Sequence, residues 1–246
     1  MQWLFIFIAG IVAGAQNALA GGGSFVTLGM LVIAGLDPRA ANITSTMALF
    51  PGQVATGYAG RGMASGAEGL SFKTLFIISL AGGIAGALLL LATPPTFFAG
   101  LVPWLVLFAT AVFFWGSFLR KQTEGTSVLS PWSAAAAQFA IAIYGGYFGG
   151  GIGFLMLAVL TVAGLPVRSA SATKNALAVA MNASAVLIFV FSRDVHWLHA
   201  AVLGAGGIAG GLAGVWLLPR ANEKWLRIGV IAIGIVLTIG LFVRGR

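Results

Sequence analysis

Apolar residues fill most of this chain in long runs, and short polar or turn-forming stretches divide these runs into ten predicted helices, five in each half. Most of the runs approach the roughly 20 residues that an α-helix needs to cross a bilayer. The pattern therefore predicts an all-α integral membrane protein. We expect its helices at about residues 3–20, 24–36, 41–60, 71–92 and 96–119, and at 132–147, 151–165, 171–191, 197–218 and 224–243.

The second predicted helix of each half is too short to cross the membrane. At 1.5 Å per residue, the segment 24–36 covers about 20 Å of a hydrocarbon core that is about 30 Å thick. Irregular backbone at this depth persists only when it is buried in protein or lines a cavity. We therefore expect a broken or re-entrant helix pair in each half, followed by three transmembrane helices.

The two halves repeat one another at an offset of 129 residues. The segment AGGGSFVTLGMLVIAGLDPRAANIT at 20–44 aligns without a gap on GGGIGFLMLAVLTVAGLPVRSASAT at 149–173, and AGGIAG occurs at both 81–86 and 205–210. Two fused copies of a membrane unit, each interrupted by glycine, are typical of transporters that bind substrate between inverted repeats.

The duplication also predicts the domain organisation. We expect a first membrane repeat at 1–121, a polar connection at 122–131 and a second repeat at 132–246, which together form one transport domain. The N-terminal sequence MQWLFIFIAGIVAGA lacks a basic start and runs into the repeated motif, so we interpret it as a retained first helix.

Basic residues predict the orientation of the chain. If the first two helices of each half return the chain to its starting side, nine basic residues share one side and four lie opposite. If each pair makes one long crossing, the division is seven against six. The positive-inside rule favours the first arrangement, which gives inverted repeats in the inner (plasma) membrane and non-cytoplasmic termini. The nine are Arg61, Lys73, Arg120, Lys121, Arg168, Lys174, Arg220, Lys224 and Arg227, and the four are Arg39, Arg193, Arg244 and Arg246.

Composition narrows the possible partners. Hydrophobic residues make up 59% of the chain and charged residues 7%. The formal charge is +8, and the basic residues lie at predicted helix ends. At these positions they orient the protein in the membrane and contact lipid headgroups, so we expect membrane lipid as a partner and do not expect nucleic acid. The absence of cysteine excludes disulfides, thiolate metal sites and cysteine nucleophiles. The oligomeric state stays open, and a homo-oligomer is one possibility.

Several segments resemble the TauE/SafE family of sulfite exporters. They are AGGGSFVTL and GGGIGFLML at the glycine breaks, AGLDPRAANITST and AGLPVRSASATKN after them, and SRDVHW after the eighth helix. The resemblance covers essentially the whole chain and rests on the order and repetition of these motifs. It implies a secondary transporter of small sulfur-containing anions, such as sulfite or organosulfonates, that usually works as an exporter.

The glycine breaks themselves favour an anion site. A helix that begins inside the membrane presents unpaired N–H groups and the positive end of its dipole, and glycine allows close approach of a ligand. The alternative is that glycine only permits tight helix crossings, which is the interpretation that we favour for AGGIAG. The candidate substrate-binding residues at the breaks are Gly21, Gly22, Gly23, Ser24, Gly150, Gly151 and Gly153.

Lys174 is the most conspicuous polar residue, because it lies near the start of an apolar helix beside Asn175. Pointing inward, its ammonium would bind a sulfonate; pointing to the membrane surface, it would be one of the orienting charges, and both alternatives stay open. Its counterpart at the repeat offset is the neutral Ser45, which fits one asymmetric anion site.

Three further amides complete the candidate substrate site: Asn17, Gln53 and Asn182. Each lies in an apolar helix and needs a polar partner there. Gln53 matches Asn182 at the repeat offset, and the alternative for this pair is a hydrogen bond between helices. Arg39 and Arg168 follow the short helices, where contact with a helix C-terminus and lipid headgroups is the favoured role.

The distribution of the other ionisable residues argues against enzymatic chemistry. All acidic residues fall in predicted connections, so no carboxylate is expected at the midplane. His196 and His199 lack acidic or cysteine partners at depth, so we expect them to flank Trp197 at an interface and expect no metal or cofactor. We expect alternating access between inverted repeats. The alternatives are an anion channel and an intramembrane lipid-modifying enzyme. An enzyme would need a nucleophile, an acid–base pair or a metal inside the membrane, and the Ser, Thr and Lys residues there have no evident catalytic partner.

Overall fold

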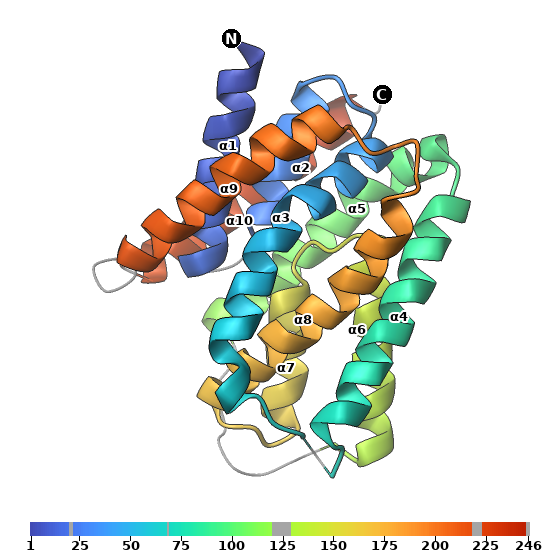
Figure 1. Cartoon of the computed structure of the whole chain (residues 1–246), viewed down its shortest axis with the longest axis vertical. Helices are drawn as coiled ribbons and strands as arrows, with labels where there is room; N and C mark the ends of the chain where they lie inside the picture. Colours follow the sequence, from blue (N-terminus) through green and yellow to red (C-terminus); the bar gives the residue numbers. More distant parts are fainter. Residues whose placement is uncertain (20–21, 68, 120–128, 218–222, 245–246) are drawn as a thin grey trace.

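The computed structural model describes residues 1–246 apart from 20–21, 68, 120–128, 218–222 and 245–246. These described residues form helices and helical turns and no β-strand (Figure 1). A single 3₁₀ turn, Arg61–Met63, follows α3, and a π-helical turn, Trp115–Leu119, extends α5. The helices are α1 Gln2–Leu19, α2 Gly23–Ile33, α3 Pro38–Gly60, α4 Phe72–Ala92, α5 Pro95–Phe114, α6 Pro131–Tyr147, α7 Ile152–Val162, α8 Val167–Phe189, α9 Trp197–Leu217 and α10 Glu223–Arg244.

The helices match the expected ranges to within a few residues, with differences at the ends of α2, α5 and α7 and at the starts of α3 and α8. Helix α3 begins at Pro38, because the Asp37 carboxylate accepts hydrogen bonds from the N–H groups of Arg39 and Ala40. Helix α8 begins directly after Pro166. Proline is pre-organised for a helix start. The expectation that both helices begin about one turn later was therefore wrong, because these capping residues were assigned to the connections.

The helices fit a multi-pass membrane protein. The short helices α2 and α7 have 11 residues each, which corresponds to about 16 Å and confirms that neither can cross a bilayer alone. Four helical segments of the described chain are long and apolar enough to cross, namely Phe72–Ala92, Pro95–Phe118, Arg168–Phe189 and Trp197–Gly214.

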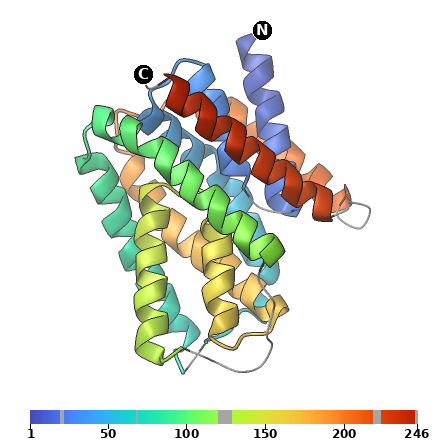
Figure 2. The ribbon, with the colours of Figure 1, turned by 180° about the vertical axis from the view of Figure 1, so that it is seen from behind.

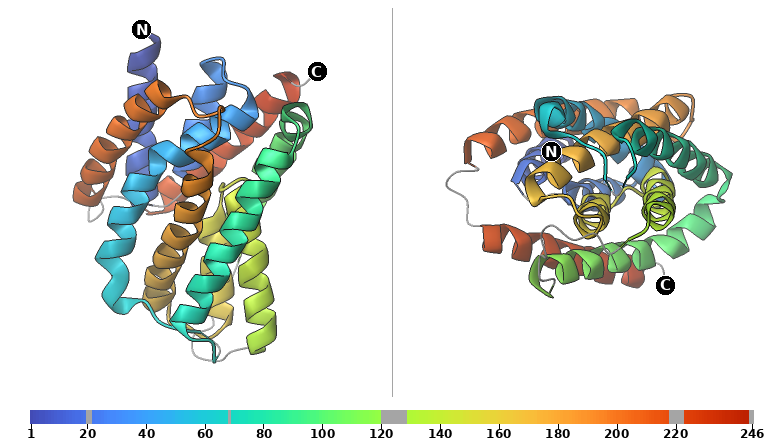
Figure 3. Two further views of the ribbon diagram at one scale, coloured as in Figure 1. Left: turned by 45° about the vertical axis from the view of Figure 1, so that its right-hand side comes forward. Right: turned by 90° about the horizontal axis from the view of Figure 1, so that it is seen from below.

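The two short helices begin in contact with one another and run toward opposite ends of the molecule (Figures 1 and 3). A Cβ atom placed at Gly150, just before α7, would lie 3.0 Å from the Phe25 ring at the start of α2. Helix α1 begins at the end of the molecule where both termini lie, whereas α6 begins at the other end (Figure 3). The chain breaks of both halves are thereby brought together.

Equivalent helices make equivalent contacts in the two halves. Helix α1 packs along α9, and its counterpart α6 packs along α4. Helix α3 packs against α8, and α5 crosses α10 on the face that Figure 2 presents. One apolar core draws on both halves and includes Phe25, Phe98, Phe113 and Phe189.

The AGGIAG segments serve helix packing, as the sequence favoured. A Cβ atom at Gly210 of α9 would lie 1.9 Å from the carbonyl oxygen of Ile11 in α1. A Cβ atom at Gly86 of α4 would lie 2.1 Å from the carbonyl oxygen of Ile143 in α6. Only glycine allows backbones to approach this closely, which confirms the packing interpretation.

Candidate functional site

The break before α2 is built on Gly22, which has a φ of 83°. This left-handed conformation favours glycine, and a Cβ atom here would also lie 2.8 Å from Cγ1 of Val230. The side chain of Asn17 caps the new helix, since its Oδ1 accepts a hydrogen bond from the N–H of Gly23 at 2.8 Å. Gly21 lies outside the described residues. The first N–H group of α2 is therefore already occupied within the protein.

The break before α7 has the same backbone and lacks the cap. Gly151, which lies 129 residues after Gly22, has a φ of 75°. The residue equivalent to Asn17 is Gly146, which has no side chain. In the described part of the chain, the N–H groups of Ile152 and Gly153 have no hydrogen-bond partner. These groups and the helix dipole make the start of α7 attractive to an anion.

Lys174 places a cation beside this uncapped helix start. A Cβ atom at Gly153 would lie 3.7 Å from both Cδ and Nζ of the lysine side chain, so the side chain extends from α8 to the first turn of α7. The side chain is partly buried, and its ammonium has no hydrogen bond or ion pair with any residue that the structure describes. A lysine without a counter-charge next to unpaired N–H groups is suited to bind an anion.

Ser45, the counterpart of Lys174 in the first half, offers no cation and is bonded within the protein. Ser45 is buried, and its hydroxyl lies 2.5 Å from Oγ1 of Thr27 in α2. Thr27 also donates to the carbonyl oxygens of Gly23 and Ser24, one turn earlier in its own helix. The first half thus has a capped helix and a satisfied hydroxyl pair, where the second half has an uncapped helix and a free ammonium.

Two of the expected site residues pair with one another. Nδ2 of Asn182 in α8 donates to Oε1 of Gln53 in α3 at 2.6 Å. This contact is the hydrogen bond between helices that the sequence left as the alternative. Asn175 lies where α8 passes α3, and its carbonyl oxygen is 3.4 Å from the Cβ position of Gly57. The pair of Gln53 and Asn182 therefore connects the two halves at the crossing of α3 and α8.

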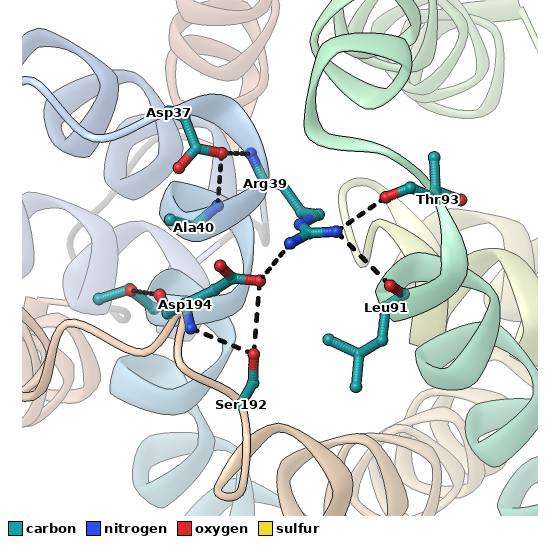
Figure 4. Close-up of polar contacts among 8 residues, drawn as sticks. Asp37, Arg39, Ala40, Leu91, Thr93, Ser192 and Asp194 are labelled. Atoms are coloured by element: carbon teal, nitrogen blue, oxygen red, sulfur yellow. Dashed lines mark hydrogen bonds and ion pairs between the residues drawn. The ribbon is translucent and has the colours of Figure 1, made fainter.

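Arg39 contacts a helix C-terminus, as expected, and also forms an ion pair that the sequence did not predict. It lies in the first turn of α3, and its Nη2 is 2.8 Å from Oδ2 of Asp194 in the connection between α8 and α9 (Figure 4). Its Nη1 donates to the carbonyl oxygen of Thr93, at the end of α4, at 2.8 Å. Arg168, the counterpart of Arg39, is exposed and has no ion pair among the described residues. The expected contact with a helix C-terminus is therefore confirmed for Arg39, at the end of α4, and a carboxylate from the other half supplies its counter-charge.

Thr44 and Thr173 connect the halves in equivalent ways. Oγ1 of Thr44 accepts from the N–H of His196 at 3.1 Å and donates to the carbonyl oxygen of Asp194 at 3.4 Å. Oγ1 of Thr173 accepts from the N–H of Ser65 at 2.9 Å and donates to its carbonyl oxygen at 3.2 Å. The repeat offset relates the two threonines and also Ser65 and Asp194, whose carbonyl oxygens accept from them, whereas the N–H donors Ser65 and His196 are not at equivalent positions.

Gln16 is a buried polar residue that sequence reasoning missed. Its side-chain nitrogen and oxygen have no hydrogen-bond partner among the described residues, and it lines a groove of about 360 Å³ between α1 and α10. The nitrogen lies 3.7 Å from the Cβ position of Gly22. Its place next to Asn17 in an apolar helix was the available signal.

The histidines form an aromatic cluster. The rings of His196 and His199 have centroids 5.5 Å apart, and His199 lies 4.8 Å from the ring of Trp3. Within the described ranges, no group of three His, Cys, Asp or Glu residues could hold a metal ion.

Comparisons with known proteins identify the family. The family model for the sulfite exporter TauE/SafE matches residues 6–241. "Probable membrane transporter protein ORF9" of Sinorhizobium sp is 30% identical over 241 residues, which cover 96% of this chain and 91% of the relative. "Probable membrane transporter protein YfcA" of Escherichia coli is 26% identical over 239 residues, with coverage of 96% and 88%. No solved structure gives a significant match. The chain therefore belongs to the TauE/SafE sulfite exporter family of membrane transporters.

Proposed function

We propose that this protein is a secondary transporter of small sulfur-containing oxyanions, such as sulfite or organosulfonates, and that it exports them by alternating access between inverted repeats. The observation that carries the proposal is the unpaired ammonium of Lys174 beside the uncapped start of α7. The family description and the transporter names of the relatives support the general class.

The anion binds between Lys174 and the first turn of α7. An oxyanion has several acceptor oxygens, so it can accept from the ammonium and from the N–H groups of Ile152 and Gly153 together. Glycine at 153 leaves room for this approach, since a Cβ atom there would already lie 3.7 Å from the lysine nitrogen. The start of α2 adjoins this site through Phe25, which lies against Gly150.

The equivalent contacts of the two halves support alternating access. Gln53 and Asn182 are related by the repeat offset of 129 residues and bond to one another, as expected for residues near a two-fold axis that exchanges the halves. Helices α2 and α7 run toward opposite ends of the molecule (Figure 1). In a pair of inverted repeats, exchange of the two conformations opens the same site to opposite sides of the membrane.

The test is flux of labelled sulfite into proteoliposomes that contain the purified protein. The proposal predicts saturable uptake, inhibition by unlabelled organosulfonates and accelerated exchange when sulfite is present inside. Protein-free liposomes provide the control for leakage. An ion-selective current that does not saturate and shows no exchange would instead identify a channel. The absence of sulfite flux and of exchange with organosulfonates would refute the assignment of substrate class.

A further inference from the structure

The two halves are held together at both ends of the molecule by equivalent threonine contacts. At the end where the termini lie, Thr44 of α3 bonds to backbone groups of Asp194 and His196, in the connection between α8 and α9. At the opposite end, Thr173 of α8 bonds to both backbone groups of Ser65, in the connection between α3 and α4. Each contact joins a helix of one half to a connection of the other half.

An ion pair strengthens the contact at the end where the termini lie. Arg39 and Asp194 approach to 2.8 Å, and their side chains are only 15% and 25% exposed. The same guanidinium donates to the carbonyl oxygens of Thr93 at 2.8 Å and Leu91 at 3.5 Å (Figure 4). One side chain thus joins α3, the end of α4 and the connection that leaves α8. Partly buried, charge-assisted contacts of this kind are stronger than exposed ion pairs.

The opposite end lacks this reinforcement. Arg168 occupies the position of Arg39, but it is exposed and has no ion pair in the part of the chain that is described. The position equivalent to Asp194 is Ser65, which carries no charge. The two ends therefore have the same threonine contact but unequal total strength.

We propose that Arg39 and Asp194 form a latch that holds the anion site closed toward the end where the termini lie, so that transport requires the latch to open. This inference rests on the proposed transport function. Lys174 directly follows Thr173, so the anion site adjoins the weaker contact at the other end. Anions enter or leave there without breaking an ion pair, and the latch determines access from the opposite side. Arg39 and Asp194 are positioning residues in this scheme.

The cysteine-free chain allows a direct accessibility test. Ser45→Cys places a single thiol at a buried position of α3, where the wild-type side chain contacts Thr27 of α2. A membrane-impermeant maleimide, added from the side of the termini, is expected to label this thiol slowly. Adding Arg39→Gln is expected to raise the labelling rate about fivefold or more, the size of a typical coupling between conformational states. Arg168→Gln is the matched control and is expected to leave the rate unchanged.

Two further variants separate latch opening from unfolding. Leu177→Cys places the thiol at a fully buried core position of α8, and its labelling is expected to stay slow with Arg39→Gln. In the double variant Arg39→Gln/Asp194→Asn, the thiol of Ser45→Cys is expected to be labelled no faster than in the faster of the two single variants, because both substitutions break the same contact. Equal rates with Arg39→Gln and Arg168→Gln, or additive effects of the two latch variants, would overturn the proposal. Labelling needs no substrate, so this result is independent of sulfite flux.

Discussion

Two glycines of α9 that lie three residues apart are expected to respond to alanine in opposite ways. A Cβ atom at Gly210 would lie 1.9 Å from the carbonyl oxygen of Ile11, whereas one at Gly207 would have its nearest neighbours at 3.9 Å. An ordinary contact needs about 3.4 Å, so Gly210→Ala must move α1 and α9 apart locally by about 1.5 Å. Gly207→Ala requires no movement.

The magnitudes follow from two opposing effects. Alanine in place of glycine favours a helix interior by about 0.5–1 kcal/mol, because the unfolded chain loses less entropy. Overpacking of a close contact costs about 1–3 kcal/mol and here acts on backbone that cannot rotate away. Because the obstructing atom at Gly210 is backbone, the upper part of the overpacking range applies, and the net expectation is a loss of about 1–2 kcal/mol for Gly210→Ala. Gly207→Ala, without overpacking, should gain about 0.5–1 kcal/mol.

Thermal unfolding of the detergent-solubilised protein measures both effects under identical conditions. At about 2–4 °C per kcal/mol for a chain of this size, Gly210→Ala should lower Tm by about 2–8 °C and Gly207→Ala should raise it by about 1–4 °C. A Tm for Gly210→Ala equal to or above that of the wild type would refute the close approach of α1 and α9.

Three further sets of substitutions test local features of the fold. Asn17→Ala removes the cap of α2 and should cost about 1 kcal/mol of unfolding free energy, whereas Asn17→Asp, which keeps an acceptor oxygen, should cost less. A double-mutant cycle with Gln53→Leu and Asn182→Leu should give a coupling of about 0.6 kcal/mol, and a value near zero would contradict the hydrogen bond between α3 and α8. Gly35→Ala should lower stability by about 1–2 kcal/mol because φ is 100°, while Gly100→Ala, also free of neighbours, should not.

The repeat made much of the helix arrangement predictable. The offset of 129 residues relates Gly22 to Gly151, and both adopt the left-handed conformation before a short helix. It also relates Gln53 to Asn182, which bond to one another. These features depend on backbone conformation and on the symmetry between the halves, and both can be inferred from a repeated sequence.

The asymmetric features were harder to predict because they depend on partners from distant parts of the chain. The carboxylate that pairs with Arg39 comes from Asp194, in the other half, and no local pattern links the two residues. The direction of Lys174 depends on how α7 packs against α8 and on the space that Gly153 leaves. Hydropathy reports how apolar a helix is, but it does not determine which neighbour a single polar side chain will meet.

We propose that Lys174 and the start of α7 bind the transported anion. The most direct test of this proposal is labelled-sulfite uptake into proteoliposomes with matched amounts of wild type, Lys174→Met and Arg168→Met. Methionine keeps the length and flexibility of the lysine side chain without its charge. We expect Lys174→Met to reduce uptake at least about tenfold, as loss of a buried charged partner does, and Arg168→Met to retain it. Saturable uptake that is unchanged in Lys174→Met would contradict this site.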